Sequence, residues 1–307
     1  MNPAKCITVA TKPNTLPLYL KTLKRRPGFK DGDQLPVTQI NWPDFQFTEQ
    51  AVRSYQTICH NTDSEGCIPL FFPHSFFGPL HLLMLTDKRF PLKLLGGVHL
   101  RNHIIQSEPL RLDQRYSAML RLTEGRRRPQ GLEVDFTTEV HLRDRTLWQS
   151  VTTFLFRCRF QQHDADSPLA ATVQNIEKPE QLTSFEVPKS VGKRFGVLTR
   201  DINPIHMSSM LARLFGFDRD LCHGMWAMGR SLPYIQGVDF SQAVRSDITF
   251  KGPLYIGRDI TIKTDADDSS HYELYSGSNE RPCVVAMLGN TTDTSQPELA
   301  TKTGEPA

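Results

Sequence analysis

Apolar and polar residues alternate along two separate stretches of the chain. The first stretch lies in residues 130–160, and the second runs from about residue 248 to residue 288. Alternation with a period of two is typical of half-buried β-strands. The apolar positions are Leu132, Val134, Phe136, Phe154, Phe156, Cys158 and Phe160 in the first series, and Ile248, Phe250, Ile260, Ile262, Tyr272, Leu274 and Cys283–Leu288 in the second. The pattern therefore predicts two sheets, one after the other.

Each strand series is preceded by a short segment that is apolar at nearly every position. These segments are Ser75–Leu85 and Gly224–Ile235. A helix that is apolar all round must be enclosed on nearly every side, and twelve helical residues form a rod of roughly 18 Å. One curved antiparallel sheet can wrap such a rod. We therefore expect an α+β protein with two antiparallel sheets, each wrapped around a central helix.

A faint internal repeat supports the idea that the same unit occurs twice. Residues 55–61 (YQTICHN) can be aligned with residues 195–201 (FGVLTRD), and residues 73–75 with residues 222–224. Both halves then show the same order of features: an aromatic start, a polar loop, a histidine, a buried helix and strands.

The length and local composition predict how the chain is divided. Its 307 residues correspond to about two domains. Residues 163–178 lose the alternation and become polar, so they are the predicted linker. We expect a solvated basic N-terminal extension at residues 1–30, an N-terminal unit at 31–162, a C-terminal unit at 179–292 and a disordered tail at 293–307.

Composition and charge exclude several classes of protein. The net charge of only +3 gives no overall field that favours nucleic acid. The six cysteines lack metal-finger spacing, so we expect reduced thiols and no metal site. No apolar run reaches the roughly 18 residues that span a bilayer. We expect a cytoplasmic protein without a membrane partner; the mitochondrial matrix is the alternative, because the first 30 residues are basic and contain no acid.

The string DINPIH at residues 201–206 carries the main chemical signal. Pro204 fixes its own backbone angle and disfavours helix at Asn203, so the bend can be rigid. A carboxylate and a histidine that converge on one water are suited to adding or removing water, since one handles the oxygen and the other a carbon-bound proton. Taken alone, each residue is better explained by a structural role, Asp201 as the cap of a turn and His206 as a buried core histidine. Their combination with Asn-Pro favours a functional interpretation.

A third component follows where the second apolar helix begins, at Cys222-His223-Gly224-Met225. Backbone N–H groups at the start of a helix lack intrahelical partners and lie at the positive end of its dipole. Gly224 allows a carbonyl oxygen to approach this backbone closely. A base, an acid and an oxyanion donor are thus expected within one 25-residue span.

These residues resemble the signature of MaoC-like dehydratases and (R)-specific enoyl-CoA hydratases, which have the hot-dog fold. The resembling residues are Asp201, Asn203, Pro204, His206, Gly216, Phe217, His223, Gly224, Met225, Ile248, Phe250, Lys251, Pro253, Leu254 and Gly257. The resemblance covers residues 185–290 and implies a double hot-dog form for the whole chain. It implies that Asp201 activates water, His206 exchanges the proton at C2 of an acyl thioester, Asn203 orders the loop and the Gly224 amide polarises the thioester.

Substrate-binding roles are expected for Arg200, His223, Met225 and Lys251. The family usually has Ser-Gly before the aspartate, whereas this chain has Thr199-Arg200. Arg200 can meet a phosphate of the carrier or hinder access of the substrate. Lys251 is a candidate because it lies close in sequence to a site-bearing segment.

The N-terminal half lacks the catalytic pattern. Asn61 stands where the repeat places the catalytic aspartate, Asp63 follows two residues later, and Ser75 occupies the position of Gly224. We expect this half to be inactive. By resemblance to two-unit members of the family, Phe71–Phe77 would hold the acyl tail; plain core packing is the alternative.

The expected function is the reversible hydration of 2-enoyl thioesters, which is also the dehydration of (3R)-hydroxyacyl thioesters. The expected substrate is acyl-CoA, with acyl carrier protein as the other carrier, and no further cofactor is required. Hot-dog folds also host thioesterases, and a non-catalytic acyl-thioester-binding subunit is a third possibility. A monomer of fused units and a homodimer are both compatible with the sequence.

Overall fold

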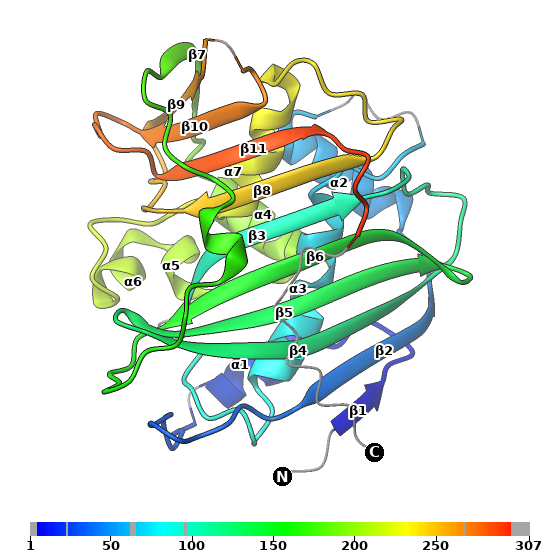
Figure 1. Ribbon diagram of the computed structural model, residues 1–307, viewed down its shortest axis with the longest axis vertical. Coiled ribbons are helices and arrows are strands. Elements are labelled where there is room, and N and C mark those ends of the chain that lie inside the picture. Colours follow the sequence, from blue (N-terminus) through cyan, green and yellow to red (C-terminus); the bar gives the residue numbers. More distant parts are fainter. Residues whose placement is uncertain (1–4, 23, 62–65, 95–96, 267, 296–307) are drawn as a thin grey trace.

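The computed structural model describes residues 5–22, 24–61, 66–94, 97–266 and 268–295 (Figure 1). The N-terminal half contains β1 (Lys5–Thr8), α1 (Thr15–Thr22), β2 (Thr38–Phe45), α2 (Glu49–Cys59), α3 (Phe72–Leu85), β3 (Gly97–Gln106), β4 (Tyr116–Arg128), β5 (Gly131–Leu142) and β6 (Arg145–Phe156). The C-terminal half contains η1 (Pro168–Ala171), β7 (Glu180–Glu186), α4 (Val191–Thr199), α5 (Pro204–Met207), α6 (Ser209–Leu214), α7 (Gly224–Ser231), η2 (Leu232–Tyr234), β8 (Val244–Phe250), β9 (Asp259–Thr264), β10 (His271–Ser276) and β11 (Val284–Asn290).

The strands of both halves form one sheet of 11 strands in the order β1-β2-β4-β5-β6-β3-β8-β11-β10-β9-β7. All neighbouring strands are antiparallel except β1 and β2. The two halves meet where β3 pairs with β8, with Asn102 opposite Ile248. The two predicted sheets are therefore joined edge to edge (Figure 1).

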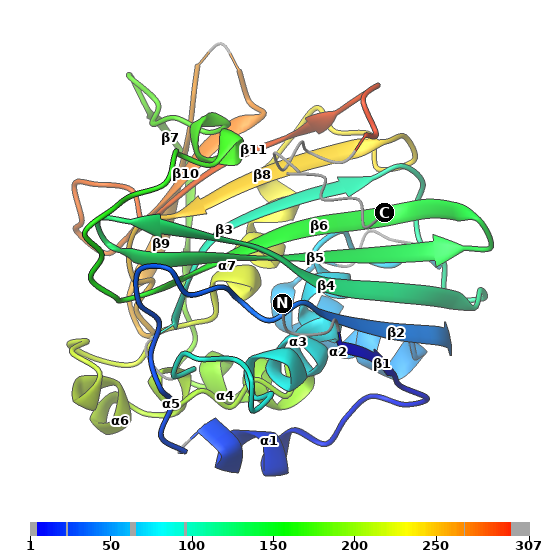
Figure 2. The same cartoon turned by 60° about the horizontal axis from the view of Figure 1, so that its bottom comes forward.

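The two predicted central helices lie on one face of this sheet (Figure 2). Twelve of the 14 residues of α3 are buried, as expected for a helix that the sheet wraps. This helix begins at Phe72, earlier than predicted, because Pro73 is well suited to the first helical turn. The second helix, α7, ends at Ser231 and continues only as the short η2, which contains Pro233. Each half thus places an enclosed helix against its own strands.

The remaining helices show the same duplication. Helices α2 and α4 occupy corresponding places, and each ends in a residue of left-handed conformation, His60 with φ 51° and Arg200 with φ 57°. These two residues are aligned in the predicted repeat. Helix α2 crosses to the other half, where Trp226 of α7 donates its indole N–H to the carbonyl of Ile58 at 2.9 Å. The halves are therefore interlocked through helices as well as through the sheet.

The N-terminal segment is not the solvated extension that its charge predicted. Strand β1 pairs with β2, and α1 packs beside α3 on the outer side of the helical layer (Figure 2). Arg26 donates to the carbonyl groups of Thr86, Asp87 and Phe90, at and beyond the end of α3, at 2.7–3.2 Å. Arg26 is therefore held by main-chain acceptors of another segment rather than solvated.

The predicted linker crosses the face of the sheet opposite the helices (Figure 1). Residues 163–178 contain only the short η1, and the backbone N–H of Ile176 donates to the Glu273 carboxylate at 3.0 Å. Most of the predicted disordered tail, residues 296–307, lies outside the described residues. Within the described ranges, no helix is long and apolar enough to cross a membrane.

Candidate active site

The loop between α4 and α5 carries the predicted carboxylate and imidazole. Arg200 ends α4 in a left-handed turn, and Asp201 follows directly. Asn203 is the N-cap of α5, where its side chain accepts a hydrogen bond from the backbone N–H two residues later, and Pro204 opens the helix. This order places His206 on the first turn of α5.

Two glycines of α4 hold this loop close to the helix backbone. A Cβ atom at Gly192 would lie 2.2 Å from the carbonyl oxygen of His206, and one at Gly196 would lie 2.6 Å from that of Asp201. Real Cβ atoms essentially never come this close to another heavy atom. Only glycine at these positions permits the observed packing of the loop.

The structure brings Asp201, His206 and His223 together. One nitrogen or carboxylate oxygen from each lies within 4.8 Å of the others. The rings of His206 and His223 stack, with centroids 3.8 Å apart and planes inclined by 26°. The predicted pair therefore converges, and His223, expected to bind substrate, is part of the same cluster.

His206 has a defined tautomer. Its Nδ1 lies 2.9 Å from the carbonyl oxygen of Leu221, which can only accept, so Nδ1 carries the hydrogen and Nε2 keeps a lone pair. Burial lowers the pKa of His206, and the Asp201 charge and the bond to Leu221 offset this only in part. The side chain is a neutral base at neutral pH.

Asp201 combines partial exposure with several donors. Its side chain is 43% exposed. Oδ1 accepts from the hydroxyl of Tyr19 at 2.9 Å and from the N–H of Asn203 at 3.2 Å, and Oδ2 lies 3.6 Å from Nε2 of His223. Desolvation alone would raise the pKa of Asp201, but His223, His206 and the Tyr19 hydrogen bond outweigh it, so the pKa lies below its ordinary value. The carboxylate is ionised at neutral pH.

His223 is the buried member of the cluster. Burial and then the neighbouring His206 lower the pKa of His223 to about 3, against the opposing effect of Asp201. Its Nε2 lies 3.3 Å from the carbonyl oxygen of Asp201, and its buried Nδ1 has no partner among the described residues. His223 is therefore neutral, and its position at the N-cap of α7 ties that helix to the catalytic loop.

Gly224 is the first residue of α7, where backbone N–H groups lack intrahelical acceptors. A Cβ atom here would lie 2.5 Å from the ring of Phe250, so a small residue is required by packing as well as by the predicted approach of a carbonyl. Met225 is only 4% exposed, and its sulfur lies 3.8 Å from the side-chain amide nitrogen of Asn102. Met225 thus belongs to the core beneath the site.

The two predicted basic substrate ligands are exposed and held by other segments. Arg200 donates to the carbonyl of Pro13 at 3.2 Å, and the ammonium of Lys251 donates to the side chain of Asn175 in the linker. A contact of either residue with the carrier remains a prediction.

Tyr19 is the functional candidate that sequence reasoning missed. It lies 182 positions before Asp201, in a segment whose basic character suggested solvent exposure. No local motif marks it, because the contact arises only from the packing of α1 against the catalytic loop.

The cluster also offers a set of metal ligands. Two imidazoles and one carboxylate are suitable donors for a divalent transition metal. An ion bound through Nε2 of His206 would occupy the lone pair that acts as a base. Metal binding at this site would therefore remove His206 as a base.

The N-terminal unit has no corresponding cluster among the described residues, where Asp201, His206 and His223 form the only such group of three. Asn61 and Ser75 stand at the aligned positions, and Asp63 lies outside the described residues.

The rings of the Phe71–Phe77 segment are buried and pack on one another and on the sheet; Phe76, for example, stacks on Trp42 at 5.8 Å. A role in holding an acyl tail remains a prediction.

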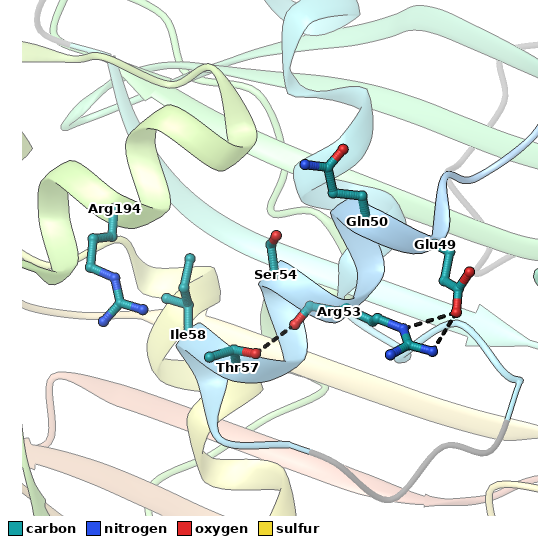
Figure 3. A pocket seen from close by; sticks show the side chains of 7 residues that line it. All are labelled: Glu49, Gln50, Arg53, Ser54, Thr57, Ile58 and Arg194. Atoms are coloured by element: carbon teal, nitrogen blue, oxygen red, sulfur yellow. Dashed lines mark hydrogen bonds and ion pairs between the residues drawn. The ribbon is translucent and has the colours of Figure 1, made fainter.

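A shallow groove between α2 and α4 is separate from this cluster (Figure 3). It is lined by Glu49, Gln50, Arg53, Ser54, Thr57, Ile58 and Arg194. Most of these residues are of polar type and none is a predicted site residue, so the groove is not a candidate for the reaction site.

Comparisons with known proteins show what the chain is similar to. A family model described as a MaoC like domain matches residues 170–276. The chain is 27% identical over 247 residues to 3-hydroxyacyl-thioester dehydratase X of Mycobacterium tuberculosis, covering 79% of this chain and 87% of that protein.

Solved structures show the same architecture. The crystal structure of HtdX from M. tuberculosis has a TM-score of 0.69 at 21% identity, covering 82% of this chain and all of the other. A second M. tuberculosis protein, described as having a double hotdog fold, has a TM-score of 0.55 at 11% identity, covering 86% and 98% of the two chains. The chain therefore has the double hot-dog fold and carries a MaoC-like domain in its C-terminal half.

Proposed function

We propose that this chain catalyses the reversible hydration of 2-enoyl thioesters to (3R)-hydroxyacyl thioesters at Asp201 and His206. The observation that carries the proposal is the convergence of the two side chains: they offer ligand atoms within 4.8 Å of each other, and the bond from Nδ1 of His206 to the Leu221 carbonyl leaves Nε2 as the base. The similarity to a protein named as a 3-hydroxyacyl-thioester dehydratase supports the same reaction class.

The mechanism assigns one step to each group. In the dehydration direction, Nε2 of His206 takes the proton from C2, and the thioester oxygen gains negative charge. The Gly224 N–H at the start of α7 stabilises this enolate. The C3–O bond then breaks as the proton that His206 took from C2 passes to the departing hydroxyl, which Asp201 orients and which leaves as water. Hydration is the reverse, so the pair ends each turnover in its starting state.

We propose acyl-CoA as the substrate, with Arg200 and Lys251 as the cations available to its phosphates. No further cofactor takes part in the proposed steps. Six free thiols fit a reducing compartment, and we propose the cytoplasm, with the mitochondrial matrix as the alternative. The functional form is a monomer of fused units or a homodimer, without a nucleic-acid or membrane partner.

The test is the loss of enoyl-thioester absorbance with crotonyl-CoA and longer acyl-CoAs. Asp201→Asn and His206→Ala should each lower turnover by at least about a hundredfold, the lower range for loss of a general acid or base. Asp259→Asn, which removes an exposed carboxylate of the same unit, is the matched control. Full turnover in either site variant would disprove the mechanism.

Two other outcomes would replace the proposal. Release of free thiol without alkene hydration would identify a thioesterase, in which Asp201 directs water to the carbonyl. Binding of acyl-CoA without any turnover, and unchanged in Asp201→Ala, would identify a non-catalytic binding subunit.

A further inference from the structure

A residue of the N-terminal segment, which precedes the N-terminal unit, contacts the carboxylate of the C-terminal unit. The hydroxyl of Tyr19, on α1, donates to Oδ1 of Asp201 at 2.9 Å. The same hydroxyl oxygen accepts from the backbone N–H of Ile202 at 3.0 Å. Because the Ile202 N–H occupies a lone pair of the phenol oxygen, the phenol hydrogen is left for the carboxylate. The Tyr19 hydroxyl is thus oriented both by the group to which it donates and by the group from which it accepts.

The two carboxylate oxygens of Asp201 have different surroundings. Oδ1 receives two donors, the Tyr19 hydroxyl and the Asn203 N–H at 3.2 Å. Oδ2 faces the histidines, 3.6 Å from Nε2 of His223. One oxygen is therefore held in place, and the other remains for water or a hydroxyl group. A fixed carboxylate loses less rotational freedom when the substrate binds.

Contacts with other segments hold the chain on both sides of α1. Before the helix, Pro13 accepts a hydrogen bond from Arg200, and the Lys12 ammonium lies 3.4 Å above the centre of the Phe76 ring. After the helix, Arg26 holds the end of α3. Arg200, which departs from the family pattern, therefore has a structural role in this chain: it binds the segment that carries Tyr19.

The charge state of the phenol agrees with a donor role. Burial, and then the negative charge of Asp201 and the hydrogen bond to it, raise the pKa of Tyr19 far above its ordinary value. The side chain keeps its proton throughout the pH range in which the enzyme would work. It acts as a donor and not as a base.

We propose that Tyr19 is a positioning residue for Asp201, so that the N-terminal segment completes the active site of the C-terminal unit. The inference rests on the proposed dehydratase function. It assigns the inactive half a direct contribution to the chemistry, through one hydroxyl group.

The test is Tyr19→Phe, which removes only the hydroxyl. Loss of a hydrogen bond to a charged group should lower kcat by about tenfold to a hundredfold, with little change in KM because the phenol acts through Asp201. Tyr234→Phe is the matched control, since it removes a phenol hydroxyl of the C-terminal unit from a ring stacked on Phe185. Both variants should melt close to the unmodified protein.

A double-mutant cycle separates positioning from a general structural effect. If Tyr19 acts through Asp201, Tyr19→Phe should cause almost no further loss in the Asp201→Asn background. An equal fractional loss in both backgrounds, an unchanged kcat, or a faster enzyme would each overturn the inference; the last would show that the phenol blocks the site. Arg26→Gln, which frees the segment at its other end, serves as a second variant and should lower kcat in the same Asp201-dependent way.

The two proposals fail in different ways. Full activity of Asp201→Asn would overturn the proposed function and this inference together. An inactive Asp201→Asn beside a fully active Tyr19→Phe would overturn only the role of Tyr19.

Discussion

The packing of α4 against the catalytic loop makes Gly192 a sensitive test of the site. In Gly192→Ala, the added Cβ would stand 2.2 Å from the carbonyl oxygen of His206, and ordinary contact begins near 3.4 Å. The loop must therefore recede by about 1 Å. A displacement of this size near reacting groups costs about a hundredfold in rate, and overpacking costs about 1–3 kcal/mol of stability.

The experiment measures kcat for crotonyl-CoA hydration together with the thermal midpoint. The matched control is Gly78→Ala in α3, whose Cβ would lie 3.8 Å from the carbonyl oxygen of Thr199, an ordinary contact. That substitution should leave the rate unchanged, and replacing glycine by alanine in a helix favours stability by up to about 1 kcal/mol. If Gly192→Ala kept full kcat, the close packing of the catalytic loop on α4 would not determine the position of His206, and this prediction would fail.

Three further predictions concern the same cluster. The value of kcat/KM should stay level near neutral pH and fall in acid as His206 gains a proton. Because burial lowers the pKa of His206, the midpoint of this fall should lie below pH 6.5. A higher midpoint would contradict the assignment of His206 as the base. Zinc should inhibit reversibly by binding Asp201, His206 and His223; a chelator should restore activity, and equal sensitivity in His223→Ala would argue against this site. Gly224→Ala should lower kcat because the added Cβ clashes with the ring of Phe250. Phe250→Leu in the same chain should then recover part of the lost kcat. If it recovered none, the whole effect would be due to a blocked approach of the thioester oxygen.

The local chemistry of this site could be predicted because it lies within a short stretch of chain. Asn203 and Pro204 fix a bend through their own backbone preferences, so the convergence of Asp201 and His206 follows from neighbouring residues. The two enclosed helices could be predicted for a similar reason, since an apolar surface on every side leaves burial as the only outcome.

Contacts between distant segments could not be predicted in this way. The Tyr19 hydroxyl reaches its partner across 182 positions, and nothing in a lysine-rich segment distinguishes a packed helix from a solvated one. Lys251 is close in sequence to the site, yet its ammonium is held by the linker. Met225 likewise contacts Asn102 from the other half of the sheet.

The pairing of β3 with β8 has a consequence for attempts to isolate the MaoC-like domain. Cutting the chain in the linker would remove β3 from one edge of β8 and expose backbone donors and acceptors along the six residues, Val244–Thr249, that pair with β3. The exposed edge of such a fragment would pair with a strand of another molecule, either in a dimer of fragments or in an aggregate. The N-terminal half, which has Asn61 at the position aligned with Asp201, therefore supplies the strand that completes the edge of the C-terminal half.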